Sequence, residues 1–151
     1  MQTDNFILRF KLDDVNFALS LDSVTRIVRA VDVTPIPNAG TKILGVINIH
    51  SDIHPVYDLR KKLGFSPRDV EIEDHFIVTK TKEMAPVVQV DKVLDVINIS
   101  NSNFADMNVD YYRNKEIKGV VQLEDGLTLI YDLETFLSQE EINSLQESLE
   151  N

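Results

Sequence analysis

The chain has 151 residues, 43% of them hydrophobic, which suits one ordinary domain with a sizeable core. Its 25 acidic and 15 basic residues give a formal net charge of −10, and a surface of that sign repels nucleic acid and anionic lipid. Cysteine is absent, which excludes disulfides, thiolate metal sites and a cysteine nucleophile. With no apolar run long enough to span or insert in a membrane, we expect a cytoplasmic protein whose partners are other proteins.

The first elements along the chain are expected to be two strands joined by a turn. Residues 6–12 and 16–21 are apolar and partly alternating, and Asp13-Asp14 between them has turn chemistry. Residues 21–28 have apolar side chains at helical spacing, which predicts one or two turns of helix. The prolines within residues 34–40 then favour a loop, because proline lacks the N–H that a strand ladder needs.

An internal repeat follows. A shift of 74 residues superposes residues 43–63 on 117–137 without a gap, and a shift of 69 or 70 superposes residues near 6–8 and 21–27 on the segments near 76–78 and 90–96. The identical pairs of the first shift are Ile43 and Ile117, Gly45 and Gly119, Val46 and Val120, Tyr57 and Tyr131, Asp58 and Asp132, Leu59 and Leu133, and Leu63 and Leu137. Because the matches keep one order, we infer two related β-units, each the size of a small closed barrel.

The expected organisation is one domain, residues 1–151, built from two lobes. The first lobe spans roughly 6–65 and the second roughly 75–137, with a polar linker at 66–74. The Asn-rich run at 98–110 is expected to be a surface loop. Whether terminal strands are exchanged between the lobes stays open.

A C-terminal helix is predicted at 138–150. Ser138-Gln139-Glu140-Glu141 is a capping box, and Ile142, Leu145 and Leu149 form one helical stripe. The helix is expected to dock on its own domain, with binding to a partner as the alternative.

Nucleophilic or phosphate chemistry has no visible motif in this sequence. The five glycines form neither a P-loop nor a dinucleotide fingerprint, and no G-x-S-x-G or H-E-x-x-H occurs. The sequence predicts neither a catalytic residue nor a cofactor.

A metal site is the alternative from another functional class. His50, Asp52 and His54 alternate, so one continuous strand would place them on one face, with His75 as the remaining imidazole. Against this, Ser51-Asp52 aligns with Asp125-Gly126 of the second copy, a hairpin-turn signal that would break the strand. We therefore expect a hairpin tip here.

The repeated Tyr-Asp-Leu is expected to be structural. Asp58 and Asp132 each end an apolar strand, which favours capping of a short helix over acid–base catalysis. Gly45 and Gly119 are expected where the backbone must approach closely.

Several short segments together carry a family resemblance. They are Thr34-Pro35-Ile36-Pro37-Asn38, Ile43-x-Gly45-Val46-Ile47-Asn48-Ile49, Ile53-x-Pro55-Val56-x-Asp58-Leu59-Arg60, Val90-Asp91-x-Val93 and Ile117-x-Gly119-Val120. From about Asp4 to Leu137, the chain resembles the CheW family of bacterial chemotaxis adaptors. The resemblance implies a mainly β fold of two packed SH3-like five-stranded barrels, with short helices.

The resemblance also implies the function. CheW proteins are not enzymes; they are scaffolds that couple the cytoplasmic tips of chemoreceptors (methyl-accepting chemotaxis proteins) to the regulatory domain of the histidine kinase CheA, itself CheW-like. Other CheW-like domains are further expected partners, and the alternative is an adaptor repurposed for another signalling system. By position, the receptor-binding residues would be Val24, Arg26, Gly45, Asn48, His50 and Ser51.

The chain departs from the family pattern within that set. Members usually have Asn-Leu-Arg-Gly where this chain has Asn48-Ile49-His50-Ser51, and commonly Glu at the position of Arg26. Arg26 and His50 cannot form the ion pair available to a glutamate and an arginine. Ser51 in place of glycine indicates a turn that does not need a positive φ, or one that tolerates it at a cost.

Overall fold

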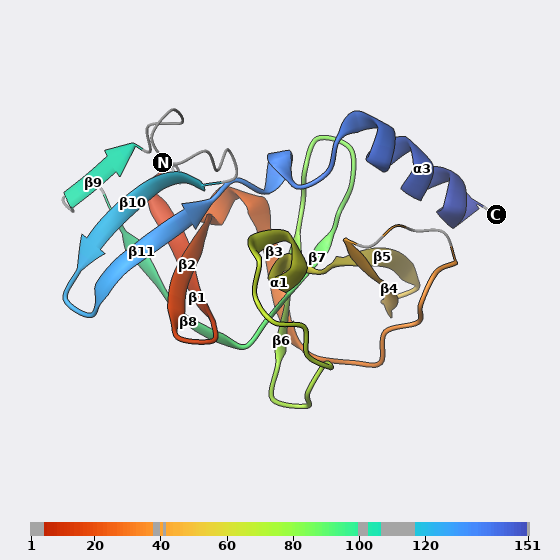
Figure 1. Ribbon diagram of the computed structural model, residues 1–151, viewed down its shortest axis with the longest axis horizontal. Coiled ribbons are helices and arrows are strands. Elements are labelled where there is room, and N and C mark those ends of the chain that lie inside the picture. The colour runs from red at the N-terminus through yellow and green to blue at the C-terminus, as the bar shows by residue number, and fades with distance from the viewer. Residues whose placement is uncertain (1–4, 38–39, 41, 100–102, 107–116, 151) are drawn as a thin grey trace.

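The structure is a computed structural model that describes residues 5–37, 40, 42–99, 103–106 and 117–150, without side chains for 103–106 and 150. Two sheets lie side by side, with a C-terminal helix across the top of one of them (Figure 1). The strands of the first, here sheet I, run in the order β8 (Lys92–Asn98), β1 (Phe6–Leu12), β2 (Val15–Ser20), β11 (Gly126–Tyr131), β10 (Ile117–Leu123) and β9 (Asn103–Asp106). Those of the second, sheet II, run in the order β3 (Val24–Arg29), β6 (His75–Thr79), β7 (Val87–Val90), β5 (Asp52–Tyr57) and β4 (Ile43–Ile49). The helical elements are η1 (Leu21–Ser23), α1 (Leu59–Leu63), η2 (Leu133–Thr135) and α3 (Gln139–Glu150).

The internal repeat is present in the strand order. The order β3-β6-β7-β5-β4 of sheet II corresponds to β8-β1-β2-β11-β10 of sheet I, element by element. The register agrees as well: the parallel pair Val56 and Val87 of sheet II corresponds to the parallel pair Ile130 and Ala18 of sheet I, at shifts of 74 and 69 residues. The mainly β fold with two related lobes is therefore confirmed.

Each sheet combines strands from both halves of the chain. The β1–β2 hairpin pairs with β8 and β11, whereas β6 and β7 pair with β3 and β5. The terminal strands are thus exchanged between the lobes, and the sheets do not follow the boundaries 6–65 and 75–137. Exchange ties the lobes together, because separating them would break ladder hydrogen bonds in both sheets.

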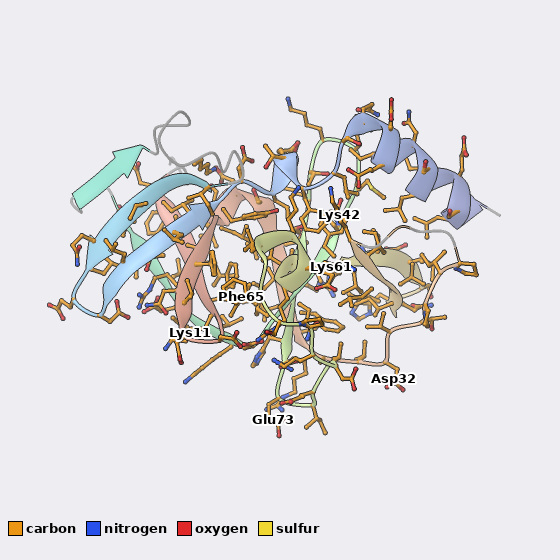
Figure 2. All side chains as sticks on the ribbon, in the orientation of Figure 1. Lys11, Asp32, Lys42, Lys61, Phe65 and Glu73 are labelled. Carbon is orange, nitrogen blue, oxygen red and sulfur yellow. The ribbon has the colours of Figure 1, made fainter. Side chains whose placement is uncertain are left out.

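The largest core cluster lies between the two lobes. Repeat-related side chains enter it from both sides, among them Leu8 and Ile77, and Tyr57 and Tyr131. The ring of Tyr57 stacks on Phe136 at a centroid distance of 4.1 Å. Burial raises the pKa of Tyr57 above its usual range. Side chains fill this junction, where Phe65 packs edge-on against Phe17 (Figure 2).

Each sheet also encloses a smaller cluster of its own. Ile7, Ala18 and Ile130 pack within sheet I, and their repeat partners Phe76, Val87 and Val56 pack within sheet II. The same positions face the same way in both lobes, as the period-two pattern of the strands requires.

Two sequence predictions of local structure were wrong. Residues 21–28, predicted as helix, form only the short turn η1 before continuing as β3. The β-branched residues of 24–28 favour a strand, and pairing with β6 decides the conformation. Of residues 98–110, predicted as a surface loop, 103–106 form β9, which pairs with β10 and adds a sixth strand to sheet I, while 100–102 and 107–110 lie outside the described residues.

The C-terminal helix has the predicted cap and the predicted buried stripe. The Ser138 N–H donates to Glu141 Oε1 and the Glu141 N–H donates to Ser138 Oγ, both at 3.1 Å. Leu145 is buried, with Ile142 and Leu149 packed against the same core cluster. The helix therefore docks on its own domain.

Candidate functional site

The predicted partner-binding residues lie on the two end strands of sheet II and on the hairpin turn beside them. Val24 and Arg26 are on β3, Gly45 and Asn48 are on β4, and His50 and Ser51 form the β4–β5 turn. The sheet curls enough to bring its ends together, because a cavity of about 140 Å³ is lined from β3, β4, β5, β6 and the turn. Its lining residues are Thr25, Arg26, Ile49, His50, Asp52, His54 and Val78.

The structure thus brings Arg26 and His50 to one cavity. The other four predicted residues, Val24, Gly45, Asn48 and Ser51, do not line it. Asn48 instead stabilises the turn beside the cavity, and Gly45 allows close packing of the backbone against β4. We call the exposed surface formed by β3 and the β4–β5 hairpin the hairpin face.

The β4–β5 turn is held in a left-handed conformation. Ile49 and Asp52 are the last paired residues, and the two between them have positive φ, 50° at His50 and 73° at Ser51. Positive φ at both central residues defines a type I′ turn, which glycine and asparagine adopt most easily. Asn48 Oδ1 accepts a hydrogen bond of 2.9 Å from the Ser51 N–H and stabilises the turn. Of the two readings of Ser51, the structure supports a positive φ tolerated at a cost.

Gly45 allows the β3–β4 connection to pack closely against β4. Its φ is 154°, and a Cβ atom at this position would lie 2.2 Å from the carbonyl oxygen of Thr34. Thr34 and Val46 exchange two backbone hydrogen bonds of 2.9 and 2.8 Å directly beside it. Gly119 occupies the equivalent position, and both ladders have a register shift there. Close backbone approach at Gly45 is confirmed.

The four residues of the metal hypothesis lie on three elements, with Asp52 and His54 together on β5. His50 is in the turn, Asp52 begins β5, and His75 begins β6 opposite Arg29. The Nδ1 of His54 donates to the carbonyl oxygen of Ala85 at 2.8 Å, so that nitrogen is occupied. Within the part of the chain that the structure describes, no group of three His, Cys, Asp or Glu side chains could hold a metal ion.

Asp58 and Asp132 cap short helices, the role that the repeat predicts for them. The Lys61 N–H donates to Asp58 Oδ1 at the start of α1, and the Glu134 N–H donates to Asp132 Oδ1 at the start of η2, each at 3.1 Å. Both carboxylates satisfy backbone donors that a helix start leaves free.

A network of ion pairs at the junction of the lobes was not predicted from the sequence. Arg60 on α1, 4% exposed, donates to Asp13 and Asp91, and Arg68 of the linker donates to Asp74 and Asp91. Asp91 therefore joins both arginines. The available sequence signal was only that Asp91 belongs to the repeated Asp-x-Val segment.

Asp74 has further donors in this network. Burial acts to raise the pKa of Asp74, but hydrogen bonds from Arg68, the Glu71 N–H and Gln89 outweigh it and lower the pKa. The linker is thereby fixed to β7 through Gln89. The junction thus has a fixed geometry.

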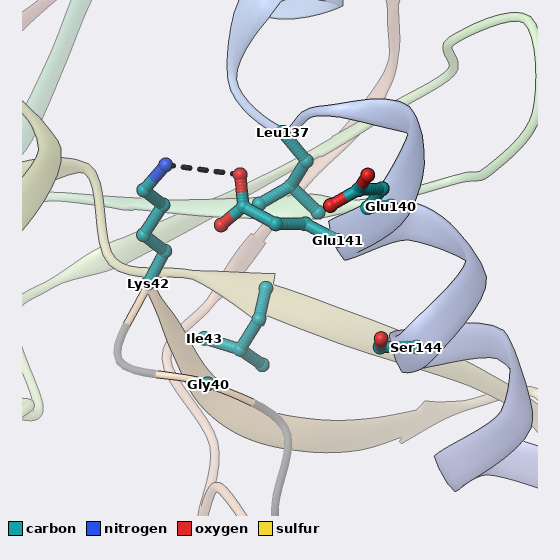
Figure 3. A pocket seen from close by; sticks show the side chains of 7 residues that line it. All are labelled: Gly40, Lys42, Ile43, Leu137, Glu140, Glu141 and Ser144. Carbon is teal, nitrogen blue, oxygen red and sulfur yellow. Dashed lines mark hydrogen bonds and ion pairs between the residues drawn. The ribbon is translucent and has the colours of Figure 1, made fainter.

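A second cavity lies where α3 meets the start of β4 (Figure 3). It has a volume of about 320 Å³, and Lys42 Nζ donates to Glu141 Oε1 across its rim at 3.1 Å. Burial acts to raise the pKa of Glu141, but hydrogen bonds from the Ser138 N–H and Lys42 lower it below its usual value. The contact fastens the helix to sheet II.

Comparison with known proteins identifies the family. A family model described as a CheW-like domain matches residues 7–141. The chain belongs to the CheW-like domain family. No α-helix in the described ranges is both long enough and apolar enough to cross a membrane.

CheW proteins with curated names are similar over most of their length. The chemotaxis protein CheW of Thermotoga maritima is 29% identical over 133 residues, which cover 88% of this chain and 87% of that protein. The chemotaxis protein CheW of Bacillus subtilis is 27% identical, covering 95% and 94%. The crystal structure of the scaffolding protein TtCheW from Thermoanaerobacter tengcongensis superposes with a TM-score of 0.80, at 24% identity and with 91% and 95% coverage. This likeness confirms the fold.

Proposed function

We propose that this protein is a non-enzymatic chemotaxis adaptor that works in the cytoplasm and couples chemoreceptors to a CheA-type histidine kinase. The observation that carries the proposal is the CheW-like match over residues 7–141, supported by CheW relatives covered along almost their whole length. An adaptor needs surfaces rather than a reactive centre. The exchanged strands and the ion-pair network provide a scaffold on which two surfaces can be held at a fixed separation.

The hairpin face is the surface that we assign to the receptor. Its strand β3 is exposed along most of its length, and the apolar side chains of Ile27 and Ile53 are 41% and 54% exposed. Exposed aliphatic side chains among polar ones suit the apolar stripe of an amphipathic helix. The partner would be the helical hairpin at the cytoplasmic tip of a receptor.

The kinase is assigned to another surface of the same scaffold. Its regulatory domain, being CheW-like in the family, would contact a barrel end of this protein through a similar barrel. Other CheW-like domains, including further copies of this chain, would use the same type of contact. Size-exclusion chromatography over a concentration series tests whether copies associate.

Binding to cognate partners tests the adaptor function directly. Purified protein at micromolar concentration is mixed with the regulatory domain of the kinase and, separately, with a receptor cytoplasmic fragment, both encoded in the same genome. Binding to both partners supports coupling. Binding to neither would refute the chemotaxis function and leave an adaptor for another signalling system. An unrelated helical hairpin of similar charge is the control for nonspecific association.

A further inference from the structure

The two lobes contain equivalent cavities with different chemistry. In sheet I a cavity of about 310 Å³ is lined by Arg9, Ile97, Leu123, Glu124 and Asp125. Three of these positions correspond to lining residues of the hairpin-face cavity in sheet II: Arg9 to Val78, Leu123 to Ile49, and Glu124 to His50, at the repeat shifts of 69 and 74. The two cavities therefore lie at the same place in the repeated fold.

In sheet I this place is occupied by an internal ion cluster. Arg9 is 8% exposed and donates through Nε and Nη2 to the two carboxylate oxygens of Asp95 on β8, at 2.7 and 3.0 Å. Its Nη1 donates to Asp125 in the β10–β11 turn at 3.1 and 3.0 Å. The hydrogen bonds to Asp95 raise the pKa of Arg9 and lower that of Asp95. One guanidinium thus joins the end strand to the hairpin turn.

In sheet II the same positions carry different residues. Val78 replaces Arg9, Arg26 replaces Asp95, and the turn residue Ser51 replaces Asp125. The end strand consequently carries the cation, and the position opposite it in the ladder is an aliphatic side chain that cannot accept a hydrogen bond.

Arg26 is therefore left without an internal partner. Among the described residues, Arg9, Arg60 and Arg68 all form ion pairs with carboxylates, whereas no carboxylate lies within 4.0 Å of the guanidinium of Arg26. The side chain is exposed and contributes to the cavity wall. A guanidinium has five donors in a planar fork that matches a carboxylate.

We propose that Arg26 binds a carboxylate side chain presented by the receptor helix that docks on the hairpin face. The incoming carboxylate takes the place that the repeated fold fills internally in sheet I, where a guanidinium and carboxylates meet. Ile27 is opposite Ile77, a residue of the lobe junction, and so lies on the other face of β3 from Arg26, which leaves the carboxylate itself as the recognised feature. The inference rests on the proposed function and specifies the partner chemistry.

Asp52 sets the strength of this site. Its carboxylate lines the same cavity and repels an incoming carboxylate without pairing with Arg26 among the described contacts. His50 and His54 add imidazole rings to the wall. Removing the charge of Asp52 is therefore expected to tighten binding, whereas removing the charge of Arg26 weakens it.

Calorimetric titration with the receptor cytoplasmic fragment tests the site in the full chain. Arg26→Gln is expected to weaken binding about tenfold, the loss of one partly exposed charge-assisted contact. Asp52→Asn is expected to tighten binding by about threefold. Added salt is expected to weaken binding of the wild type more steeply than binding of Arg26→Gln. Arg29→Gln, an exposed charge on the same strand outside the cavity, is the matched control and is expected to stay within about twofold.

Charge exchange identifies the partner residue. In the Arg26→Glu background, replacing the contacting receptor acid with lysine is expected to restore binding, and the same lysine is expected to weaken binding to the wild type. If the wild type binds but Arg26→Gln and Arg29→Gln have equal affinity, this inference is overturned and the adaptor function stands. If the wild type binds neither receptor nor kinase, the proposed function itself fails. Urea midpoints of the variants verify that each is folded.

Discussion

Replacing Asp91 with alanine removes the carboxylate on which the junction of the two lobes depends. Asp91 Oδ2 accepts from Arg60 Nη2 and from the Asp13 N–H, both at 2.6 Å, and Oδ1 accepts from Arg68. These donors come from α1, from the β1–β2 turn and from the linker. A single change therefore loosens three segments at once.

The expected loss of stability is about 3 kcal/mol. Removing one partner of a buried pair costs about 3 to 5 kcal/mol, because a charge is left buried without compensation. Arg60 is that charge, since its side chain is 5% exposed. Arg60 keeps its ion pair with Asp13, Arg68 keeps its ion pair with Asp74, and Arg68 and Asp91 are partly accessible, which places the loss at the lower end.

Urea unfolding at neutral pH measures this loss. The m-values of variant and wild type are compared to verify that the surface area exposed on unfolding is unchanged. Asp14→Ala is the matched control, because Asp14 is an exposed carboxylate in the turn beside Asp13, and its loss is expected to change stability by less than about 0.5 kcal/mol. A decrease below about 1 kcal/mol for Asp91→Ala, with an unchanged m-value, would refute the idea that this carboxylate holds the junction.

Three further perturbations address the hairpin face and the ion pairs. Gly45→Ala is expected to destabilise the protein by about 3 kcal/mol, because its Cβ would force apart the two backbone hydrogen bonds between Thr34 and Val46. Ser51→Gly is expected to stabilise it by about 0.5 to 1 kcal/mol, because glycine adopts the observed φ of 73° without strain. In an acid titration the contribution of the Arg9–Asp95 pair to stability is expected to be complete above the ordinary aspartate pKa of 3.8 and to be lost as pH falls further, because Asp95, hydrogen-bonded to Arg9, has a lowered pKa in the folded state and stays charged there.

Each of these expectations has its own control. Gly64→Ala introduces a side chain at a φ of 83° but into open space, so its cost isolates backbone strain from the clash at Gly45. Equal losses for the two glycine variants would show that the close approach to Thr34 is unimportant. A thermal midpoint for Ser51→Gly at or below that of the wild type would contradict turn strain. Arg9→Gln is expected to reduce the loss of stability at acid pH. An unchanged dependence of the unfolding free energy on pH would exclude the Arg9–Asp95 pair as a cause of that loss.

Much of the architecture could be predicted because the repeat carries it. Matching residues such as Gly45 and Gly119 occur where the backbone geometry is the same in both lobes, so sequence similarity and strand order agree. The exchange of strands could not be deduced, since the β1–β2 hairpin has the same pattern whichever sheet accepts it. The strand at 24–29 was mistaken for a helix because its apolar spacing fits a helix, whereas pairing with β6 is a long-range contact.

The site was predicted only in part, for a related reason. Position in a family pattern placed Arg26 and His50 in one region, and the structure brings both to one cavity. The network around Asp91 was missed because its members are 78, 31 and 23 residues away along the chain from it, beyond any local pattern. Ion pairs of this kind are set by tertiary geometry, and a single sequence has no period that indicates them.

The repeat also explains why the hairpin face can change its specificity without loss of the fold. In sheet I the Arg9 cluster joins strand to turn, so replacing one member would leave a charge buried beside the core. In sheet II no ion pair among the described residues joins β3 to the β4–β5 turn, and the backbone hydrogen bonds between Thr34 and Val46 correspond to the β9–β10 ladder of sheet I, so neither depends on the side chain at position 26. That position is therefore free to carry either charge, and its sign can follow the partner.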